Sequence, residues 1–411
     1  MRILHLMPYS PVPPTFGGAL RVYHLLRLLA RNHELTVLTF GNAQNKIELE
    51  SHFGNQVKNI HFIEKHWTRK YKRIGQLYSL LGRHSFYYMM ARHNQMQQKL
   101  DELFDRNKFD IALTEFPHTA SYEMNTDAVK IMDAHNVEYE IFRRMWLNAR
   151  SPLRQLYYKS EYKKFYHEEM IAIRRQNSIL VTSVNDKNIL DREVPEVPKY
   201  VIPNGVDAEY FTPTDEKREP NSLVFTGTMS YVPNYDGLVY FLDTIFPIIQ
   251  KTIPDIKIYI VGNNPPKNLL SRASNNIVIT GFVDDVRPYI NRSSVYVVPL
   301  RMGSGTRLKV LEAMSMRIPI VTTSMGCEGI NVVDNESVLI ANEPESFAES
   351  VIKLLNNKNL RQTLTENGFE LMKSKYEWSV IGNDLERTLQ TLVNNKNKYL
   401  KYSSSNFANR I

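Results

Sequence analysis

The chain opens with ILHLM (residues 3–7), PYSPVPPTFGG (8–18), LRVYHLLRLLAR (20–31) and LTVLTF (35–40), and these four segments decide its fold. The first and last are apolar runs of strand length, whereas the third places its leucines at helical spacing. A strand, a helix and a second strand in this order predict a parallel sheet, because parallel strands need a crossover connection and a helix supplies it.

The same alternation continues along the chain. The first half predicts further strands at Ile60–Ile63, Ile111–Thr114, Val129–Met132, Ile179–Thr182 and Tyr200–Ile202. After the charged, proline-containing stretch 213–220 the pattern restarts, with strands at Leu223–Phe225, Ile256–Val261, Ile277–Ile279, Val295–Val298, Ile318–Thr322 and Val338–Ile340. Sheets of this kind carry helices on both faces and bind ligands at the carboxyl ends of their strands.

This duplicated pattern predicts an α/β protein with two Rossmann-like, doubly wound parallel-sheet domains that face each other across a cleft. We expect an N-terminal domain over residues 1–208 and a C-terminal domain over 209–375. Residues 376–395 predict a last helix that packs back on the N-terminal domain, and residues 396–411 predict a polar tail.

The composition narrows the class of protein. The net charge of +8 favours anionic partners such as nucleotides, nucleic acid or an acidic membrane surface. The single cysteine, Cys327, excludes a disulfide framework within one chain and indicates the cytoplasm. Met1–Pro8 is too short for a signal peptide, and no apolar run reaches the ~18 residues of a spanning helix. Any membrane contact is therefore expected to be peripheral, at the inner face of the cell membrane.

Four segments that flank predicted strands share their order and spacing with one known family. They read FGG at 16–18, IPNGVD at 202–207, TGTM at 226–229 and PLRMGSGTRLKVLEAM at 299–314. In these segments, and in DAHNVE at 133–138, the chain resembles the retaining glycosyltransferases of family 4, up to about Gln390. The resemblance implies the GT-B fold, with an acceptor-binding first domain and a second domain that binds a nucleotide-sugar donor.

The resemblance also implies an activity: transfer of a sugar, with retention of configuration, from a nucleotide-diphosphate sugar to a glycan or lipid-linked acceptor during polysaccharide assembly. The chain departs from the family at two places. The family usually carries two glutamates eight positions apart, and here the first position holds Ser304 while the second holds Glu312. The segment Met229–Gly237 also lacks the Arg and Lys that the family often places there. A subgroup of polysaccharide-assembly transferases is similar in both respects and has a basic residue where Lys309 stands.

The second domain predicts an anion site at a helix start. A helix over Arg307–Met316 would direct its N-terminal N–H groups at a diphosphate, and Lys309 would add charge on the same face as Glu312. By resemblance, Glu312 accepts hydrogen bonds from the ribose. The expected donor-binding residues are Gly17, Gly18, Gly227, Thr228, Gly303, Ser304, Gly305, Thr306, Arg307, Lys309 and Glu312. Without the family context, a helix N-cap at Ser304 or Thr306 with a surface ion pair explains the same residues.

Three side chains of the first domain are candidates for the reacting centre, besides Lys309 on the donor side. Glu115 and His118 follow a predicted strand, and His135 lies just past the end of the next one. Any of them could orient the acceptor hydroxyl or the transferred sugar, and the sequence leaves the choice open. Arg21, in the first helix, is either an added phosphate contact or a solvated arginine.

The expected mechanism needs no metal and no cofactor. In this family the leaving phosphate helps to take the acceptor proton, so the protein mainly positions groups and stabilises charge on the diphosphate. The chain offers no spaced Asp-x-Asp motif, and the adjacent pair Asp284 and Asp285 is expected to cap a helix over Val286–Arg292. A fingerprint G-x-G-x-x-G is also missing, which argues against a dinucleotide-dependent oxidoreductase.

The segment Lys65–Arg92 holds seven Lys or Arg residues, no acid, and several aromatic residues. It is either a solvated basic helix pair or a docking patch for an anionic membrane, with Arg69, Lys70, Lys72 and Arg73 as its centre. Nucleic acid is not expected, since no recognition motif accompanies the patch.

Two other functions stay open: a non-catalytic protein of the same fold that binds a sugar nucleotide or a partner, and a nucleotide-sugar epimerase. Turnover of a donor separates the first from a transferase, and release of a new sugar nucleotide without an acceptor would identify the second.

Overall fold

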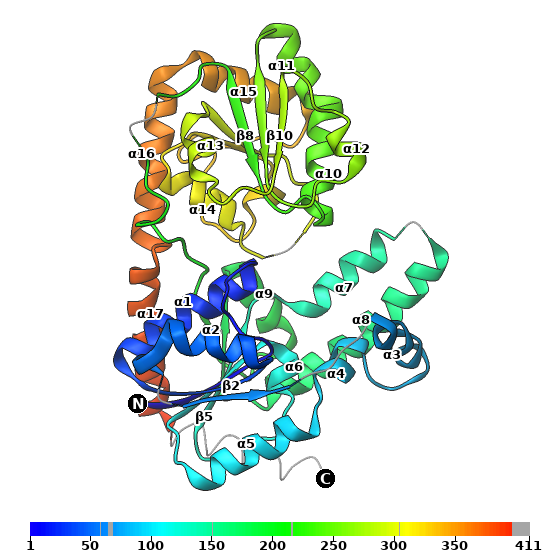
Figure 1. Cartoon of the computed structure of the whole chain (residues 1–411), viewed down its shortest axis with the longest axis vertical. Coiled ribbons are helices and arrows are strands. Elements are labelled where there is room, and N and C mark those ends of the chain that lie inside the picture. Colours follow the sequence, from blue (N-terminus) through cyan, green and yellow to red (C-terminus); the bar gives the residue numbers. More distant parts are fainter. Residues whose placement is uncertain (58, 65–68, 150, 215–216, 304, 397–411) are drawn as a thin grey trace. The chain divides into compact units, whose positions relative to one another are not determined.

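The computed structural model describes residues 1–57, 59–64, 69–149, 151–214, 217–303 and 305–396, and for residues 69–73 it describes the backbone alone. The chain forms two compact units: unit 1 comprises Met1–Ile202 and Gly382–Ile411, and unit 2 comprises Pro203–Ile381. Each unit is an open parallel sheet with helices packed against it (Figure 1). Among the described residues, no helix is long and apolar enough to cross a membrane.

The sheet of unit 1 has seven strands in the order β3-β2-β1-β4-β5-β6-β7, and every neighbouring pair is parallel. The strands are β1 (Arg2–Met7), β2 (Glu34–Phe40), β3 (Asn59–Ile63), β4 (Ile111–Glu115), β5 (Val129–Ala134), β6 (Ser178–Val181) and β7 (Lys199–Val201). The order reverses between β1 and β4, and ligands of such sheets bind at the carboxyl ends of the strands beside this reversal.

The helices of unit 1 connect these strands and cover the sheet. Because both faces are covered, strands such as β1 and β4 are buried along nearly their whole length and are largely apolar, with His5 and Glu115 as buried exceptions. The helices are α1 (Gly17–Asn32), α2 (Ala43–Phe53), α3 (Arg69–Leu81), α4 (Phe86–Ala91), α5 (Asn94–Arg106), α6 (Phe116–Ala120), α7 (Glu138–Leu147), α8 (Pro152–Arg174) and α9 (Val184–Glu193), with a short 3₁₀ turn at Gly54–Gln56.

Unit 2 repeats the plan with six parallel strands in the order β10-β9-β8-β11-β12-β13. The strands are β8 (Ser222–Thr226), β9 (Lys257–Val261), β10 (Ile277–Gly281), β11 (Val295–Val298), β12 (Ile320–Thr322) and β13 (Leu339–Ile340). Its order reverses between β8 and β11, so the segments that follow these two strands form the expected ligand edge.

The helices of unit 2 include a π-helical stretch, Phe241–Ile245, between α10 and α11. The others are α10 (Val232–Tyr240), α11 (Phe246–Thr252), α12 (Lys267–Leu270), α13 (Arg287–Arg292), α14 (Leu308–Ser315), the 3₁₀ turn Met325–Cys327, α15 (Pro344–Asn356) and α16 (Lys358–Lys375). The last helix, α17 (Trp378–Asn394), begins in unit 2 and continues in unit 1. Within unit 1 its Glu386 accepts a hydrogen bond at 2.7 Å from His33, the residue that follows α1.

Each strand expected from the sequence lies on an observed strand, so the two-sheet α/β prediction is confirmed. Helix starts are less accurate. The first helix begins at Gly17 rather than Leu20, because the glycine pair already adopts helical geometry. Helix α14 begins at Leu308 rather than Arg307, and α13 begins at Arg287, whose backbone N–H donates to the Asp285 carboxylate at 2.9 Å.

Candidate active site

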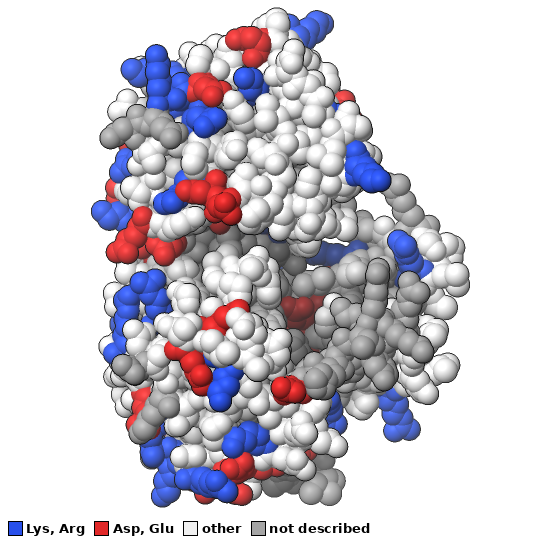
Figure 2. Space-filling view, viewed as in Figure 1, with Lys and Arg blue, Asp and Glu red and all other residues white. Residues whose placement is uncertain are grey.

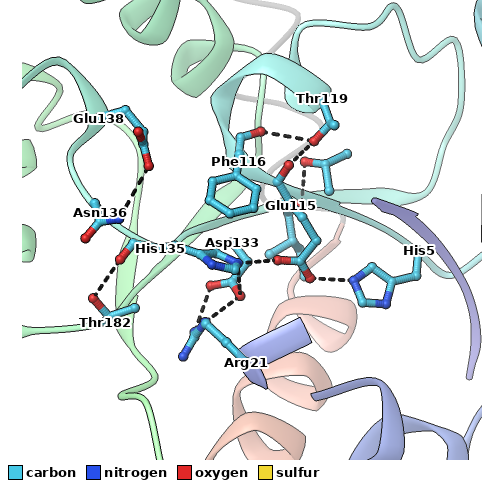
Figure 3. A network of polar contacts seen from close by, with 12 residues as sticks. His5, Arg21, Glu115, Phe116, Thr119, Asp133, His135, Asn136, Glu138 and Thr182 are labelled. Atoms are coloured by element: carbon cyan, nitrogen blue, oxygen red, sulfur yellow. Dashed lines mark hydrogen bonds and ion pairs between the residues drawn. The ribbon is translucent and has the colours of Figure 1, made fainter. Parts of the chain in front are cut away.

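A buried chain of polar groups connects the carboxyl ends of β4 and β5 with the middle of β1 in unit 1 (Figure 3). The carboxylate of Glu115, the last residue of β4, accepts from His5 Nε2 at 2.5 Å and from His135 Nε2 at 2.7 Å. His5 and Glu115 are fully buried, and His135 is only 5% exposed. One glutamate therefore fixes two imidazole rings.

A second buried pair lies beside this chain. Arg21 of α1 donates from Nε and Nη2 to the two oxygens of Asp133 on β5, at 2.7 and 2.8 Å. Both side chains are buried, so the two expectations for Arg21, a phosphate contact or a solvated side chain, are both wrong in this structure. A bidentate arginine–carboxylate pair is strong and geometrically specific, and it ties α1 to the sheet.

The electrostatics of the network follow from its hydrogen bonds. Burial raises the pKa of Glu115, but the bonds from His135 and His5 outweigh burial and hold it well below its usual range. Glu115 is therefore an anion at neutral pH, and each histidine donates from Nε2. Burial raises the pKa of Asp133 and Arg21 opposes this shift. Hydrogen bonding to the charged form is what keeps a buried carboxylate ionised.

Aromatic rings surround the exposed end of the network. Phe116 follows Glu115 with a φ of 68°, a conformation that is strained for a side chain of this size. Its ring lies over His135, with centroids 3.9 Å apart, and stacks on His118. On the other side, a Cβ at Gly18 would lie 2.7 Å from Tyr9 Oη and 3.5 Å from His135 Nδ1. The first turn of α1 thus packs directly against His135.

This geometry separates the three candidates of unit 1. Both oxygens of Glu115 are engaged and its side chain is inaccessible, so it cannot itself contact a substrate in this conformation. His135 uses Nε2 for Glu115 and turns Nδ1 towards Gly18. His118 lies on α6, partly exposed, with its ring against Phe116. The structure brings Gly17, Gly18 and His135 together, with Glu115 behind His135.

In unit 2, Lys309 of α14 reaches the carboxyl end of β8. Its Nζ donates to the Thr226 carbonyl at 2.7 Å and to Asn234 Oδ1 at 2.9 Å. A Cβ at Gly227 would lie 2.9 Å from this ammonium group, and Gly227 has a φ of 150°, so only glycine fits. Asn234 is held in turn by its amide, which donates to the Thr228 carbonyl at 3.0 Å.

Glu312 lies one turn after Lys309 on α14, and the two charges interact. Burial lowers the pKa of Lys309 to about 7, and the Glu312 charge opposes this shift. Burial likewise raises the pKa of Glu312 to about 7, opposed by Lys309. Among the described residues, no hydrogen bond reaches the Glu312 carboxylate, and the side chain keeps part of its surface exposed. Its position on the Lys309 face of the helix confirms the expected i, i+3 relation.

The loop before α14 contains two glycines in left-handed conformations, Gly303 with φ 121° and Gly305 with φ 78°. The Arg307 guanidinium lies under Gly303, and its Nε donates to the Met325 carbonyl at 3.2 Å. Arg307 occupies the N-cap position without a side-chain capping bond, so Thr306 is not the N-cap residue that the simpler interpretation allowed. Ser304 itself lies outside the described residues.

Glu115, Asp133 and His135 could together hold a cation, because one ligand atom from each lies within 4.8 Å of the others. The surroundings do not fit a metal. Asp133 is already bound by Arg21, and Glu115 by two histidines. A divalent ion would have to displace a buried guanidinium of the same charge sign, which is strongly unfavourable.

The predicted membrane patch falls on α3. The backbone of Arg69, Lys70, Lys72 and Arg73 forms the start of this helix, and their side chains lie outside the described part of the chain.

Sequence reasoning missed two residues that hold candidate site residues in place. Asn234 orients Lys309 from within the segment that lacks the family's cations, and His5 fixes Glu115 from the middle of β1. A polar residue inside an otherwise apolar strand was the available signal for His5. Gly262 was missed as well: it directly follows β9, and a Cβ there would lie 1.9 Å from the Gly227 carbonyl oxygen.

Comparisons with known proteins match both units of the chain to glycosyltransferases. The family model for Glycosyltransferase Family 4 matches residues 17–210, and the model for Glycosyl transferases group 1 matches residues 220–357. An uncharacterized 44.6 kDa protein in the cps region of Klebsiella pneumoniae is 22% identical over 392 residues, which is 92% of this chain and 96% of that protein.

A second relative has a name that states the reaction it catalyses. The UDP-Gal:alpha-D-GlcNAc-diphosphoundecaprenol alpha-1,3-galactosyltransferase of Escherichia coli is 28% identical over 234 residues, and the match covers 50% of this chain and 59% of that protein. Among solved structures, TarM superimposes with a TM-score of 0.69 at 12% identity and covers 96% of this chain and 99% of its own. The last likeness shows a shared fold.

Proposed function

The chain belongs to glycosyltransferase family 4 and has the GT-B fold, and from this premise we propose that it transfers a sugar, with retention, from a nucleotide-diphosphate sugar to a glycan or lipid-linked acceptor. The relative from a cps region and the relative that acts on a diphosphoundecaprenol-linked sugar support a place in polysaccharide assembly.

The arrangement around Lys309 carries the donor proposal. Its ammonium group is held at the carboxyl end of β8, beside the sheet reversal where such folds bind ligands. Glu312 follows on the same helix face with a carboxylate that could accept from ribose hydroxyls. Gly303 and Gly305 give the loop before α14 the backbone freedom to approach a diphosphate. Gly227, Thr228 and Thr306 complete the proposed donor site, and Ser304 and Arg307 remain proposed members.

The role of Lys309 would be to stabilise the charge that grows on the leaving diphosphate. Preorganised charge of this kind needs no reorganisation during the reaction. We propose that no metal is required, because this ammonium group and the helix start supply the positive charge. A chelator should therefore leave turnover unchanged; activity that is lost with chelator and restored by Mg²⁺ or Mn²⁺ would contradict the proposal.

In unit 1, His135 is the best supported contact for the transferred sugar or the acceptor. Its Nε2 lies against the Glu115 carboxylate, and in the tautomer that donates from Nε2 the Nδ1 atom would accept from a hydroxyl group of the ligand. Glu115 then acts as a positioning residue through His135. His118 is the alternative contact. Gly17 and Gly18 would contribute backbone N–H groups at the start of α1.

The test is a screen of nucleotide sugars for thermal stabilisation, followed by turnover with the stabilising donor. Native-state binding raises the melting temperature, so the true donor should stand out. NMR of the product should show the anomeric configuration of the donor preserved. An inverted product contradicts retention, a new sugar nucleotide formed without acceptor indicates an epimerase, and binding without any turnover indicates a non-catalytic protein.

A further inference from the structure

Helix α3 exposes apolar side chains in a regular stripe. Ile74, Leu77, Tyr78 and Leu81 are all exposed, with Leu81 at 92% and Tyr78 at 68%. Their spacing of three and four residues places them on one face of the helix. A surface helix of a water-exposed protein normally turns such a face inwards, so the orientation of α3 is the reverse of the usual one.

The opposite face of α3 is anchored within unit 1. The Ser79 carbonyl accepts from Lys164 Nζ of α8, and Ser79 is fully buried. Gly75 packs against Phe86 of α4, where a Cβ would lie 3.0 Å from the ring. Because the opposite face of α3 already packs against α4 and α8, the exposed stripe does not belong to the core of unit 1.

A second exposed apolar segment lies where α7 ends and α8 begins. Leu147, Leu153 and Leu156 are exposed, with Leu153 at 81%. Leu153 lies one turn before Tyr157 on α8, the helix whose Lys164 donates to the Ser79 carbonyl of α3. The segment therefore adjoins α3, and Figure 1 shows α3, α7 and α8 together at the right of unit 1.

The sequence around each exposed apolar segment, residues 65–92 and residues 141–160, contains no Asp or Glu. Residues 65–92 contain seven Lys or Arg residues, and residues 141–160 contain five: Arg143, Arg144, Arg150, Arg154 and Lys159. At the outer end of these elements, Figure 2 shows basic atoms and no acidic atoms among the coloured residues on the face in view. Two copies of such a surface would repel each other, which disfavours a dimer through this face.

We propose that the stripe of α3 and the exposed side chains of Leu147, Leu153 and Leu156 form one lipid-docking surface that lies in the headgroup region of an anionic membrane. Leucine and tyrosine side chains would enter the boundary with the acyl chains, while the basic residues contact lipid phosphates. The surface goes beyond the sequence prediction, which rested on the basic and aromatic residues of 65–92 and did not include the exposed leucines of α7 and α8. It does not depend on the proposed function, because binding to vesicles is measured without any donor.

The experiment is co-sedimentation of the full chain with phosphatidylcholine vesicles that contain increasing fractions of phosphatidylglycerol, at low and high salt. The charge contribution is screened by salt, whereas the apolar contribution is not. We expect the parent to bind anionic vesicles at low salt and to keep part of this binding at high salt. Leu77→Asn combined with Leu81→Asn should weaken the salt-resistant binding at least tenfold.

The matched control combines Leu270→Asn with Val333→Asn in unit 2, where both side chains are also exposed. It should bind vesicles like the parent. Both double variants should keep the parent's melting temperature, since the four changed side chains are exposed in the folded protein. Reversal of Arg69, Lys70, Lys72 and Arg73 to glutamate should release the protein at low salt.

A single label gives a second readout. A polarity-sensitive dye at Leu81→Cys should shift to the blue on vesicle addition, and the same dye at Leu270→Cys should not. A parent that ignores anionic vesicles at low salt, or a double variant that binds like the parent at high salt, overturns the proposal. A lipid-free dimer that the double variant abolishes also overturns it, because the stripe is then a protein interface.

Discussion

Glu115 of unit 1 is fully buried and Glu312 of unit 2 is partly exposed, and the surroundings of these two glutamates shift their pKa values in opposite directions. Two histidines donate to Glu115 and lower its pKa, whereas burial raises the pKa of Glu312 to about 7. Hydrogen bonds from its own chain satisfy Glu115, and among the described residues none reaches Glu312. Glu115 is therefore held rigidly by its own chain, whereas the Glu312 carboxylate can accept hydrogen bonds from a ligand.

The same contrast holds for the two cations. The buried Arg21 donates two hydrogen bonds to Asp133 and so ties α1 to β5 in unit 1. Lys309 donates to a carbonyl and an amide oxygen, both uncharged, and remains partly exposed. A cation whose hydrogen-bond acceptors are neutral gains more from an arriving diphosphate than one that already donates to a carboxylate. Substitutions in unit 1 should therefore cost stability, and those in unit 2 donor affinity.

The largest expected effect is on stability. Asp133→Asn leaves Arg21 buried without its counter-charge, and breaking a buried pair from one side typically costs about 3–5 kcal/mol. Chemical denaturation should show a loss of this size in the free energy of unfolding. Asp384→Asn, which removes an exposed partner of Arg387, is the control and should change little. Equally small losses of unfolding free energy in both variants would contradict the structural role assigned to the Arg21–Asp133 pair.

The next effect is on donor affinity. Lys309→Ala should raise the donor dissociation constant by roughly 10- to 100-fold, since a hydrogen bond to a charged group contributes about 1.5–3 kcal/mol. Arg307→Ala should have a smaller effect, because that guanidinium points to the Met325 carbonyl and lies near Glu328. Isothermal titration calorimetry provides both values. Similar small effects from the two variants would show that the diphosphate charge is met elsewhere.

The smallest effect is a pH profile. Lys309, with a pKa near 7, loses its charge as the pH rises, so donor binding should weaken on the alkaline side. Glu312, with a pKa near 7, becomes protonated as the pH falls, so binding should also weaken on the acid side. Each limb should change by at most about tenfold per pH unit. Glu312→Gln should flatten the acid limb and keep the alkaline one; two unchanged limbs would contradict this assignment.

The sequence predicted the sheets better than the sites. Strand positions such as Val295–Val298 can be predicted from local apolar runs, because strands of a parallel sheet that is covered on both faces are mostly apolar. Helix starts are set by capping and backbone geometry, which a residue pattern defines only loosely, so α1 and α14 began elsewhere than expected.

The site residues divide along the same line. Lys309 and Glu312 could be paired from sequence because a helix fixes residues three apart on one face. Partners that are distant in sequence could not: His5 meets Glu115 across 110 positions, and Arg21 meets Asp133 across 112. Such pairings depend on which strands become neighbours in the sheet. Arg21 was misjudged for this reason, since nothing near it in sequence reveals its carboxylate partner.

The central claim is that Glu312, rather than Glu115, contacts the donor nucleotide. The direct measurement is the donor dissociation constant of Glu312→Gln and of Glu115→Gln, determined side by side by calorimetry on folded protein. Glu312→Gln should weaken binding by roughly 10- to 100-fold, because the charge-assisted acceptor for the ribose is lost, while Glu115→Gln should bind like the parent. Parent-like affinity in Glu312→Gln, or a greater loss in Glu115→Gln, would contradict the account.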